Sequence, residues 1–252
     1  MKALITGATS GIGQSIARQL SLSGWELILT GRNEKMLRKM QSEMKTKTEI
    51  IKADLSENED VFKVYDFCRG KSVDMLVNNA GYGIFGKFDE TDLGDEINMI
   101  NVNITALHIL TKLFLRDFKK RNSGMILNVA SSAGFMTGPL LSSYYASKNY
   151  VVRLSLAIAE ELRHDHSKVT ITVLCPGPVD TNFNNRAGVR FSIKPAPVDE
   201  VAKYAIEKTL SGKLIAIPTL SIKAGVLATK FIPTKMLSAI TYHIQKKKVD
   251  KP

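Results

Sequence analysis

We predict a doubly wound α/β fold from three features of the 252-residue sequence. First, short apolar runs alternate with longer amphipathic stretches, which is typical of parallel strands joined by right-handed helical crossovers. Second, several runs are nearly continuous in isoleucine, leucine and valine, as in strands covered on both faces of a sheet. Third, no internal repeat or low-complexity linker divides the chain, and its length suits one domain.

The apolar runs predict a mainly parallel, seven-stranded sheet with strands at residues 2–6, 26–30, 49–52, 73–78, 124–130, 169–175 and 213–218. The amphipathic stretches predict helices at 11–23, 33–45, 57–69, 92–121, 144–163 and 198–211. Helices 92–121 and 144–163 carry apolar residues almost all round, so each is expected to be buried on a second side. They pack either against neighbouring helices of the same chain or in the interface of a homodimer or homotetramer, and we favour the interface.

The C-terminal residues 219–252 are expected to form a basic, partly helical extension of the domain that spans 1–218. Met236, Leu237, Ile240 and Ile244 repeat at helical spacing after Pro233. One interpretation, which we favour, is a helix packed on the domain and followed by solvated lysines. The alternative is an interfacial helix whose lysines meet anionic lipid head groups, which would make peripheral membrane contact.

The charge supports both interpretations of this segment. The net charge is +11. From Lys213 to the end the chain has eight lysines and one acid, so this segment holds most of the excess positive charge. No recognition motif accompanies the charge, which disfavours nucleic acid as a partner. Cys68 and Cys175 lack partner spacing, and the four histidines form no metal-ligand pattern. With no signal peptide and no apolar run of about 18 residues, we expect a cytoplasmic protein with buried free thiols and no metal.

The first strand is followed by the sequence TGATSGIG, residues 6–13, at the predicted junction of strand and helix. Glycines at 7, 11 and 13 allow the backbone to approach a pyrophosphate, which the helix N-terminus stabilises. A glycine pattern alone is weak evidence, but in this position it is a strong indication of dinucleotide binding.

The end of the second strand bears on which dinucleotide is bound. NAD sites usually place an acid there, whereas this chain has Thr30, Gly31 and then Arg32. No carboxylate repels a 2′-phosphate, and the Arg32 guanidinium can bind one, so we expect NADP(H) to be preferred over NAD(H). Otherwise Arg32 is a surface residue at a helix start.

Two adjacent tyrosines, Tyr144 and Tyr145, precede Lys148 by four and three residues. On a helix either spacing brings a tyrosine onto a face next to the lysine, so spacing alone does not choose between them.

Six motifs occur in the order found in the short-chain dehydrogenase/reductase family, which the chain resembles from residue 2 to about residue 182. They are TGATSGIG, NNAG (78–81), VNITA (102–106), ASSAG (130–134), YYASK (144–148) and PGPVDT (176–181). The resemblance implies a Rossmann-type dinucleotide-binding and catalytic domain. It also implies that residues 183–197 form a substrate lid.

The resemblance implies four catalytic residues. The family's Tyr-x-x-x-Lys motif fits Tyr144 and Lys148, and its serine, usually thirteen residues before the tyrosine, is Ser131. Tyr144 is then the general acid/base and Tyr145 a packing residue. Lys148 holds the nicotinamide ribose and lowers the pKa of Tyr144, while Ser131 binds the substrate oxygen. Asn103 anchors a water in a proton relay, although Ala106 replaces the family's usual glycine nearby.

The resemblance also implies a set of cofactor contacts that combines Tyr144 and Lys148 with the glycine turn. The remaining members of the set are Gly7, Thr9, Ser10, Gly11, Ile12, Gly13, Arg32, Asp54, Leu55, Asn79, Ala80, Gly81, Pro176, Gly177, Val179 and Thr181.

The expected function is hydride transfer between NADP(H) and a carbonyl or secondary alcohol, in the reductive direction, as in a carbonyl reductase or alcohol dehydrogenase. The alternative from another class is a non-catalytic protein that binds NADP(H) and senses redox state. The substrate is open among an acyl chain, a steroid-like ring, a sugar and a small diketone, and the apolar C-terminal segment favours a lipophilic carbonyl.

Overall fold

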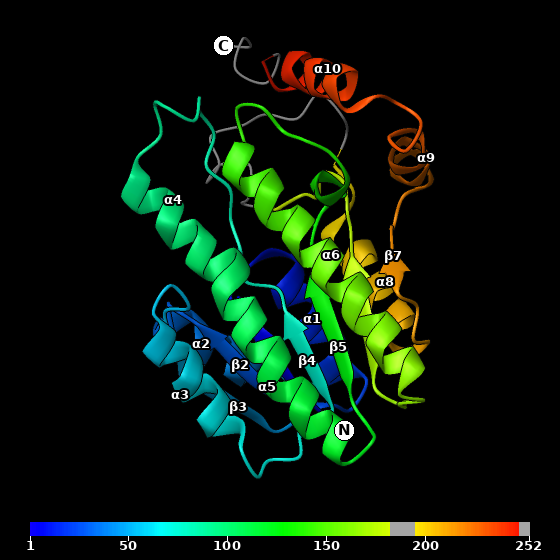
Figure 1. Cartoon of the computed structure of the whole chain (residues 1–252). Coiled ribbons are helices and arrows are strands. Elements are labelled where there is room, and N and C mark those ends of the chain that lie inside the picture. Colours follow the sequence, from blue (N-terminus) through cyan, green and yellow to red (C-terminus); the bar gives the residue numbers. More distant parts are fainter. Residues whose placement is uncertain (182–194, 247–252) are drawn as a thin grey trace.

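The computed structural model describes residues 1–181 and 195–246, and its centre is a seven-stranded parallel sheet (Figure 1). The strands follow the order β3-β2-β1-β4-β5-β6-β7, which reverses direction after β1 as in a doubly wound sheet. Their bounds are β1 Lys2–Thr6, β2 Glu26–Gly31, β3 Thr48–Lys52, β4 Met75–Asn78, β5 Met125–Val129, β6 Thr170–Leu174 and β7 Ile215–Ala216. The predicted fold class is confirmed.

The helices connect these strands and cover both faces of the sheet. Their bounds are α1 Gly11–Leu22, α2 Glu34–Glu43, α3 Asn58–Cys68, α4 Leu93–Ile100, α5 Leu107–Lys120, α6 Ser142–His164, α8 Val198–Leu210, α9 Leu220–Ala228 and α10 Thr234–Lys246. A 3₁₀ turn, Ser132–Phe135, lies between β5 and α6.

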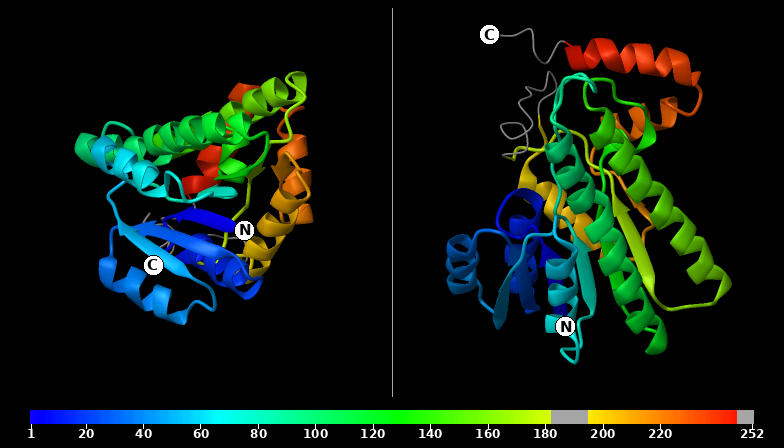
Figure 2. Two further views of the ribbon diagram at one scale, coloured as in Figure 1. Left: turned by 90° about the horizontal axis from the view of Figure 1, so that it is seen from below. Right: turned by 60° about the vertical axis from the view of Figure 1, so that its left-hand side comes forward.

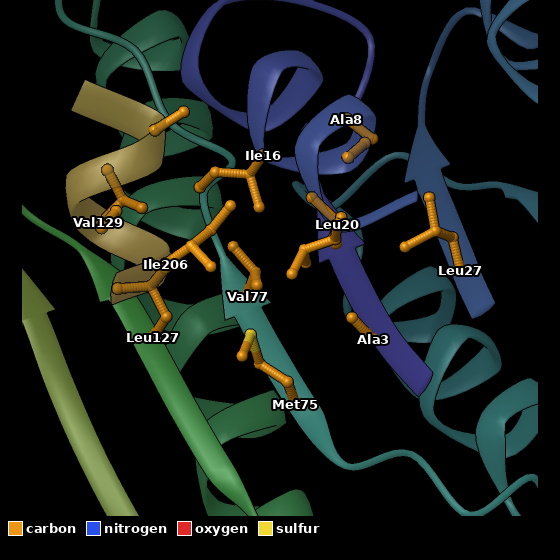
Figure 3. Close-up of a cluster of buried hydrophobic side chains, with 14 of the residues drawn as sticks. Ala3, Ala8, Ile16, Leu20, Leu27, Met75, Val77, Leu127, Val129 and Ile206 are labelled. Carbon is orange, nitrogen blue, oxygen red and sulfur yellow. The ribbon is translucent and has the colours of Figure 1, made fainter. Parts of the chain in front are cut away.

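Alternate residues of each strand belong to opposite cores. Ile5 of β1 packs with Ile16 and Leu20 of α1 and with Ile206 of α8, and Figure 3 shows this cluster against the sheet. The preceding residue, Leu4, belongs to the other core, which includes side chains of α3, α5 and α6. The central strands β1, β2 and β4 are therefore buried on both faces, which explains why their sequences are almost continuously apolar, whereas the edge strand β3 is only partly buried.

The segment predicted as one helix over 92–121 is interrupted by a π-helical turn. α4 and α5 are joined by Asn101–Ala106, whose backbone is wider than that of an α-helix. Such turns insert an extra residue and often mark functional sites. Ala106 is fully buried at the end of this turn, in the core beneath α5.

α10 lies across the end of the molecule toward which the strands point, next to the beginning of α6 (Figures 1 and 2). Its Ser238 hydroxyl is 2.6 Å from that of Thr137. Residues 183–194 of the expected lid and the last six residues of the chain are outside the described residues. Within the described part, no helix is long and apolar enough to cross a membrane.

Candidate active site

A pocket of about 440 Å³ opens at the carboxyl ends of the central strands. It is lined by the turn after β1, the start of α1, the segments after β2, β3, β4, β5 and β6, one face of α6, and one residue each of α9 and α10. All the residues expected at the site line this pocket except two. Gly13 and Asn103 lie behind residues of the pocket wall. Gly13 packs against Asn79, and Asn103 is hydrogen-bonded to the backbone of Tyr82.

The glycine turn after β1 is closely packed against the segment after β4. Gly7 has a φ of +60°, and a Cβ on it would lie 2.8 Å from the Ala80 Cα. A Cβ on Gly13 would overlap the Asn79 amide and lie 2.7 Å from the Gly7 carbonyl. Glycine is therefore needed at both positions, for conformation at Gly7 and for space at both.

Asn79 joins the two segments through its side chain, which donates hydrogen bonds to the carbonyls of Thr6 and Gly7 at 3.0 and 3.1 Å. Directly beyond this turn, α1 begins at the pocket without a side-chain cap from Ser10 and without an acid in its first turn. The uncapped N-terminus of α1 suits an anionic group such as a pyrophosphate. The turn thus fits the dinucleotide that the sequence implies.

Arg32 lies directly after β2 in the pocket wall. Its side chain is more than half exposed, and its nearest acid is Asp54, 3.9 Å away. Gly31 contacts Thr9, and a Cβ there would be 3.2 Å from the threonine methyl. No carboxylate side chain occupies the last position of β2, so the arginine is available to a phosphate.

Tyr144 and Ser131 meet at the opposite end of the pocket. Tyr144 is in the first turn of α6 and is 9% exposed, and its phenol is hydrogen-bonded to the Ser131 hydroxyl. Ser131 precedes the 3₁₀ turn and caps it by accepting a hydrogen bond from the Ala133 amide at 3.2 Å. The cap fixes the serine next to the tyrosine.

Burial raises the pKa of the Tyr144 phenol above its usual range, and the hydrogen bond with Ser131 lowers it only in part. The expected lowering of this pKa includes the charge of a bound nicotinamide, so it stays a prediction for the complex with the cofactor. In the protein alone a buried phenolate is costly, and Lys148 does not offset the cost. Its ammonium nitrogen lies 5.8 Å from the tyrosine ring centroid.

Lys148 is 5% exposed and donates a hydrogen bond to the Val129 carbonyl at 3.0 Å. Desolvation lowers its pKa to about 8. A Cβ on Gly81 would lie 3.3 Å from the lysine nitrogen and 2.9 Å from the Asn103 Oδ1. The glycine of the NNAG motif therefore makes room for both side chains.

Asn103 is fully buried within the π-helical turn and holds the segment after β4. Its Oδ1 accepts a hydrogen bond from the Tyr82 amide at 3.0 Å, and its Nδ2 donates to the Tyr82 carbonyl at 2.9 Å. The same Nδ2 donates to the Ser147 hydroxyl at 3.0 Å. Asn103 thus ties the pocket wall to α6, a role that the sequence did not indicate.

Tyr145, expected only to pack, also lines the pocket and binds α10. Its ring lies against Gly138, and its hydroxyl accepts a hydrogen bond of 2.5 Å from the Gln245 Nε2. Gln245 is 1% exposed, and its Oε1 has no hydrogen-bond partner among residues 1–181 and 195–246. Sequence analysis missed this contact, because the two residues are a hundred positions apart and no local pattern joins them.

Further apolar side chains line the pocket, namely Tyr82, Leu141, Ile222 and Ile244. Of these four, the sequence singled out only Ile244, and only for its helical spacing. Ile222 of α9 lies against Gly177, where a Cβ would be 2.6 Å from its methyl group. The apolar spacing of the C-terminal segment was visible in the sequence, but its position at the pocket was not.

The family model described as short chain dehydrogenase matches residues 1–189. Among curated relatives, an uncharacterized oxidoreductase of Staphylococcus saprophyticus is 32% identical over 214 residues, which cover 82% of this chain and 91% of the relative. A very-long-chain 3-oxoacyl-CoA reductase of Anas platyrhynchos is 33% identical over 204 residues, which cover 77% of this chain and 64% of the relative.

Two solved structures share the architecture. A short-chain dehydrogenase from Sphingobium yanoikuyae in complex with NADPH has a TM-score of 0.82 at 28% identity, with 91% of this chain and 92% of that one covered. A short-chain dehydrogenase/reductase from Burkholderia phymatum in complex with NAD has a TM-score of 0.81 at 25% identity, with 90% and 91% covered. Since one holds NADPH and the other NAD, similarity supports a nicotinamide dinucleotide without choosing between the two.

Proposed function

This chain belongs to the short-chain dehydrogenase/reductase family, and from that premise we propose that it is an NADP(H)-dependent reductase of lipophilic carbonyl compounds. The observation that carries the proposal is the meeting of Tyr144, Ser131 and Lys148 at one end of a pocket whose other end is the glycine turn. A proton donor and a hydrogen-bonding hydroxyl are thereby within reach of the same bound dinucleotide.

When bound, NADPH supplies the hydride that adds to the carbonyl carbon. Tyr144 donates its phenolic proton to the carbonyl oxygen, which completes the alcohol, and Ser131 stabilises the negative charge that develops on that oxygen. A tyrosine with a pKa of about 10 is protonated at neutral pH, as reduction requires. Lys148, with its ammonium beside Gly81, binds the ribose next to the nicotinamide and supplies positive charge.

Preference for NADPH rests on Arg32. An exposed guanidinium can bind a 2′-phosphate bidentately, and the only acid within 4 Å of Arg32 among the described residues is Asp54, at 3.9 Å. Because cells keep this cofactor mainly reduced, we assign the reductive direction and a cytoplasmic location.

The substrate class follows from the side chains beyond the catalytic residues. Leu141, Tyr145, Ile222 and Ile244 offer an apolar wall with few polar groups, which suits a long acyl chain or fused rings better than a sugar. A relative named as a very-long-chain 3-oxoacyl-CoA reductase supports the same class. We include 3-oxoacyl thioesters among the substrates to be tested first.

We further propose a homodimer or homotetramer through α5 and α6.

The proposal is tested by NADPH oxidation with ketones, aldehydes and 3-oxoacyl thioesters of increasing chain length. Tyr144→Phe should lower kcat by about 10²- to 10⁴-fold, because the proton donor is lost while the ring stays in place. The matched control is Tyr145→Phe, which removes the adjacent phenol and should retain turnover. NADH in place of NADPH measures the cofactor preference.

Turnover that survives Tyr144→Phe and disappears in Tyr145→Phe would overturn the assignment of the acid. Tight NADPH binding without turnover of any carbonyl in the series would instead favour the non-catalytic, redox-sensing alternative.

A further inference from the structure

An unusual share of the exposed apolar side chains lies on α9, α10 and the turn between them. Of the fourteen large hydrophobic residues that are exposed in the described chain, seven lie between positions 220 and 244. Leu220 and Phe231 are 84% and 80% exposed, the two highest values among them. Isolated exposed leucines are common, but a cluster of this kind marks a surface that binds something.

On α10 the exposed residues form a row of their own. Leu237, Thr241 and Gln245, spaced four apart, are buried and hold the helix on the domain. The neighbouring row, Met236, Ile240 and Ile244, has the same spacing and is exposed. Helix packing therefore uses one row, and the second apolar row has no partner in the described structure. We call Leu220, Leu227, Phe231 and this second row the α9–α10 surface.

The charge around the α9–α10 surface has a single sign. Residues 213–246 contain five lysines and no acid, although the chain has 24 acids in all. Lys223, Lys230 and Lys235 are exposed between the apolar residues. A second copy of the chain docked there by two-fold symmetry would bring these lysines against one another, which is unfavourable. A surface of anionic lipids complements both the apolar side chains and the lysines.

The α9–α10 surface adjoins the mouth of the pocket. Ile222 and Ile244 line the pocket, and Ile244 is also half exposed in the outward row of α10. α10 crosses the end of the molecule toward which the strands point (Figure 2). The pocket opens at the same end, because it lies at the carboxyl ends of the central strands. A flat layer against the α9–α10 surface would therefore lie next to the entrance for the substrate.

We propose that the α9–α10 surface docks on an anionic lipid membrane and presents the pocket to the lipid–water interface. Lipophilic carbonyl compounds would then enter from the membrane rather than from water. The docking stands on the surface alone, whereas the supply of substrate rests on the proposed reductase function.

The test is flotation of the full-length protein with vesicles of phosphatidylcholine, and with vesicles of phosphatidylcholine and phosphatidylglycerol in equal parts. Leu220→Ser with Phe231→Ser should lower the partition coefficient on the mixed vesicles by about tenfold or more, because two inserted side chains are lost. The matched control, Leu22→Ser with Phe62→Ser, changes an exposed leucine of α1 and an exposed phenylalanine of α3 and should leave binding unchanged.

Charge is tested in the same way. Lys223→Glu with Lys230→Glu should lower binding to the mixed vesicles by about tenfold or more. Lys45→Glu with Lys47→Glu changes the net charge equally, at exposed lysines outside the surface, and should have a much smaller effect. Turnover of a small water-soluble ketone should be the same in all four variants, since none of these residues lines the pocket.

Equal binding to both kinds of vesicle, or binding that survives both α9–α10 variants, would overturn the proposal. So would the absence of vesicle binding together with a dimer, seen by light scattering, that Leu220→Ser with Phe231→Ser dissociates. If vesicles are bound as expected but no carbonyl is reduced, the docking is supported and the reductase function is the part that fails.

Discussion

The two ends of the pocket differ in whether backbone or side chains form the wall. At the cofactor end the wall is largely backbone, formed by the turn from Gly7 to Gly13 and by the segment after β4 that Asn79 ties to it. At the substrate end the wall is made of large side chains, among them Tyr145, Ile222 and Ile244. A wall made of backbone keeps its shape when most side chains are substituted, whereas a wall made of side chains changes shape with each substitution. Rigid recognition of a common cofactor and adjustable recognition of a substrate are thus separated in one cavity.

Lys148 belongs to the same end of the pocket as Tyr144 and Ser131, and its replacement should have the largest effect. We expect Lys148→Met to lower turnover by about 10³-fold, since the positive charge and the ribose contact are lost together. The same change should raise the free energy of unfolding at neutral pH by roughly 1 to 2 kcal/mol, because a desolvated ammonium is removed while the Val129 carbonyl loses its donor. Steady-state kinetics measures the loss of turnover, and urea unfolding measures the gain in stability. A variant that is less stable than the wild type would contradict the predicted gain.

The pH dependence gives an independent check. The lysine pKa is lowered to about 8 in the folded protein from an ordinary 10.5, so between these values the unfolded chain binds more protons. The free energy of unfolding of the wild type should therefore rise with pH across this interval, relative to Lys148→Met. The rise from pH 7 to pH 10 is about 2.5 kcal/mol at these pKa values, so the advantage of Lys148→Met at neutral pH should disappear and reverse by pH 10.

At the cofactor end, Arg32→Asp should reverse the preference between the dinucleotides. A carboxylate would repel the 2′-phosphate and accept hydrogen bonds from the ribose of NAD(H), so we expect KM for NADPH to rise by about 10- to 100-fold and KM for NADH to fall. Arg38→Asp, a change of the same charge on the exposed side of α2, is the control. Equal effects on both cofactors would show that Arg32 does not meet the phosphate.

The same substitution in two helices compares the packing of the two regions. Gly13→Ala in α1 should lower the free energy of unfolding by about 2 kcal/mol or more, because the new methyl group meets the Gly7 carbonyl and Asn79. Gly225→Ala in α9 adds a methyl group with no atom within 4 Å and should raise it by about 0.5 to 1 kcal/mol. Thermal unfolding of both variants measures these changes. If both substitutions lowered or both raised the free energy of unfolding, the two helices would not differ in packing as proposed.

The smallest effect is expected from Tyr145→Phe at the substrate end. It removes the hydrogen bond from Gln245 while the ring stays on Gly138. With α10 held less firmly, KM for bulky carbonyls should rise by about two- to tenfold, a loss of roughly 1 kcal/mol, and kcat for a small ketone should stay within about twofold. Gln245→Leu should have the same effect, and a loss of kcat on small ketones would instead assign the second tyrosine a part in the chemistry.

The sequence alone determined the order of strands and helices, the glycine turn and, by resemblance, the choice of Tyr144 over Tyr145. These features are local. A glycine with positive φ, an apolar strand and a tyrosine one helical turn before a lysine each depend on neighbours within a few residues. The described helices and strands accordingly follow the predicted ones closely, apart from the π-helical turn around Asn103.

Only the tertiary structure decided how distant segments share the site. It placed Gln245 on Tyr145, Ile222 on Gly177, and Gly81 between Asn103 and Lys148. It also set the direction of the pKa of Tyr144, because that direction depends on burial and on the position of the lysine rather than on their spacing in the chain. Such contacts follow from the packing of whole elements, which no short stretch of sequence encodes.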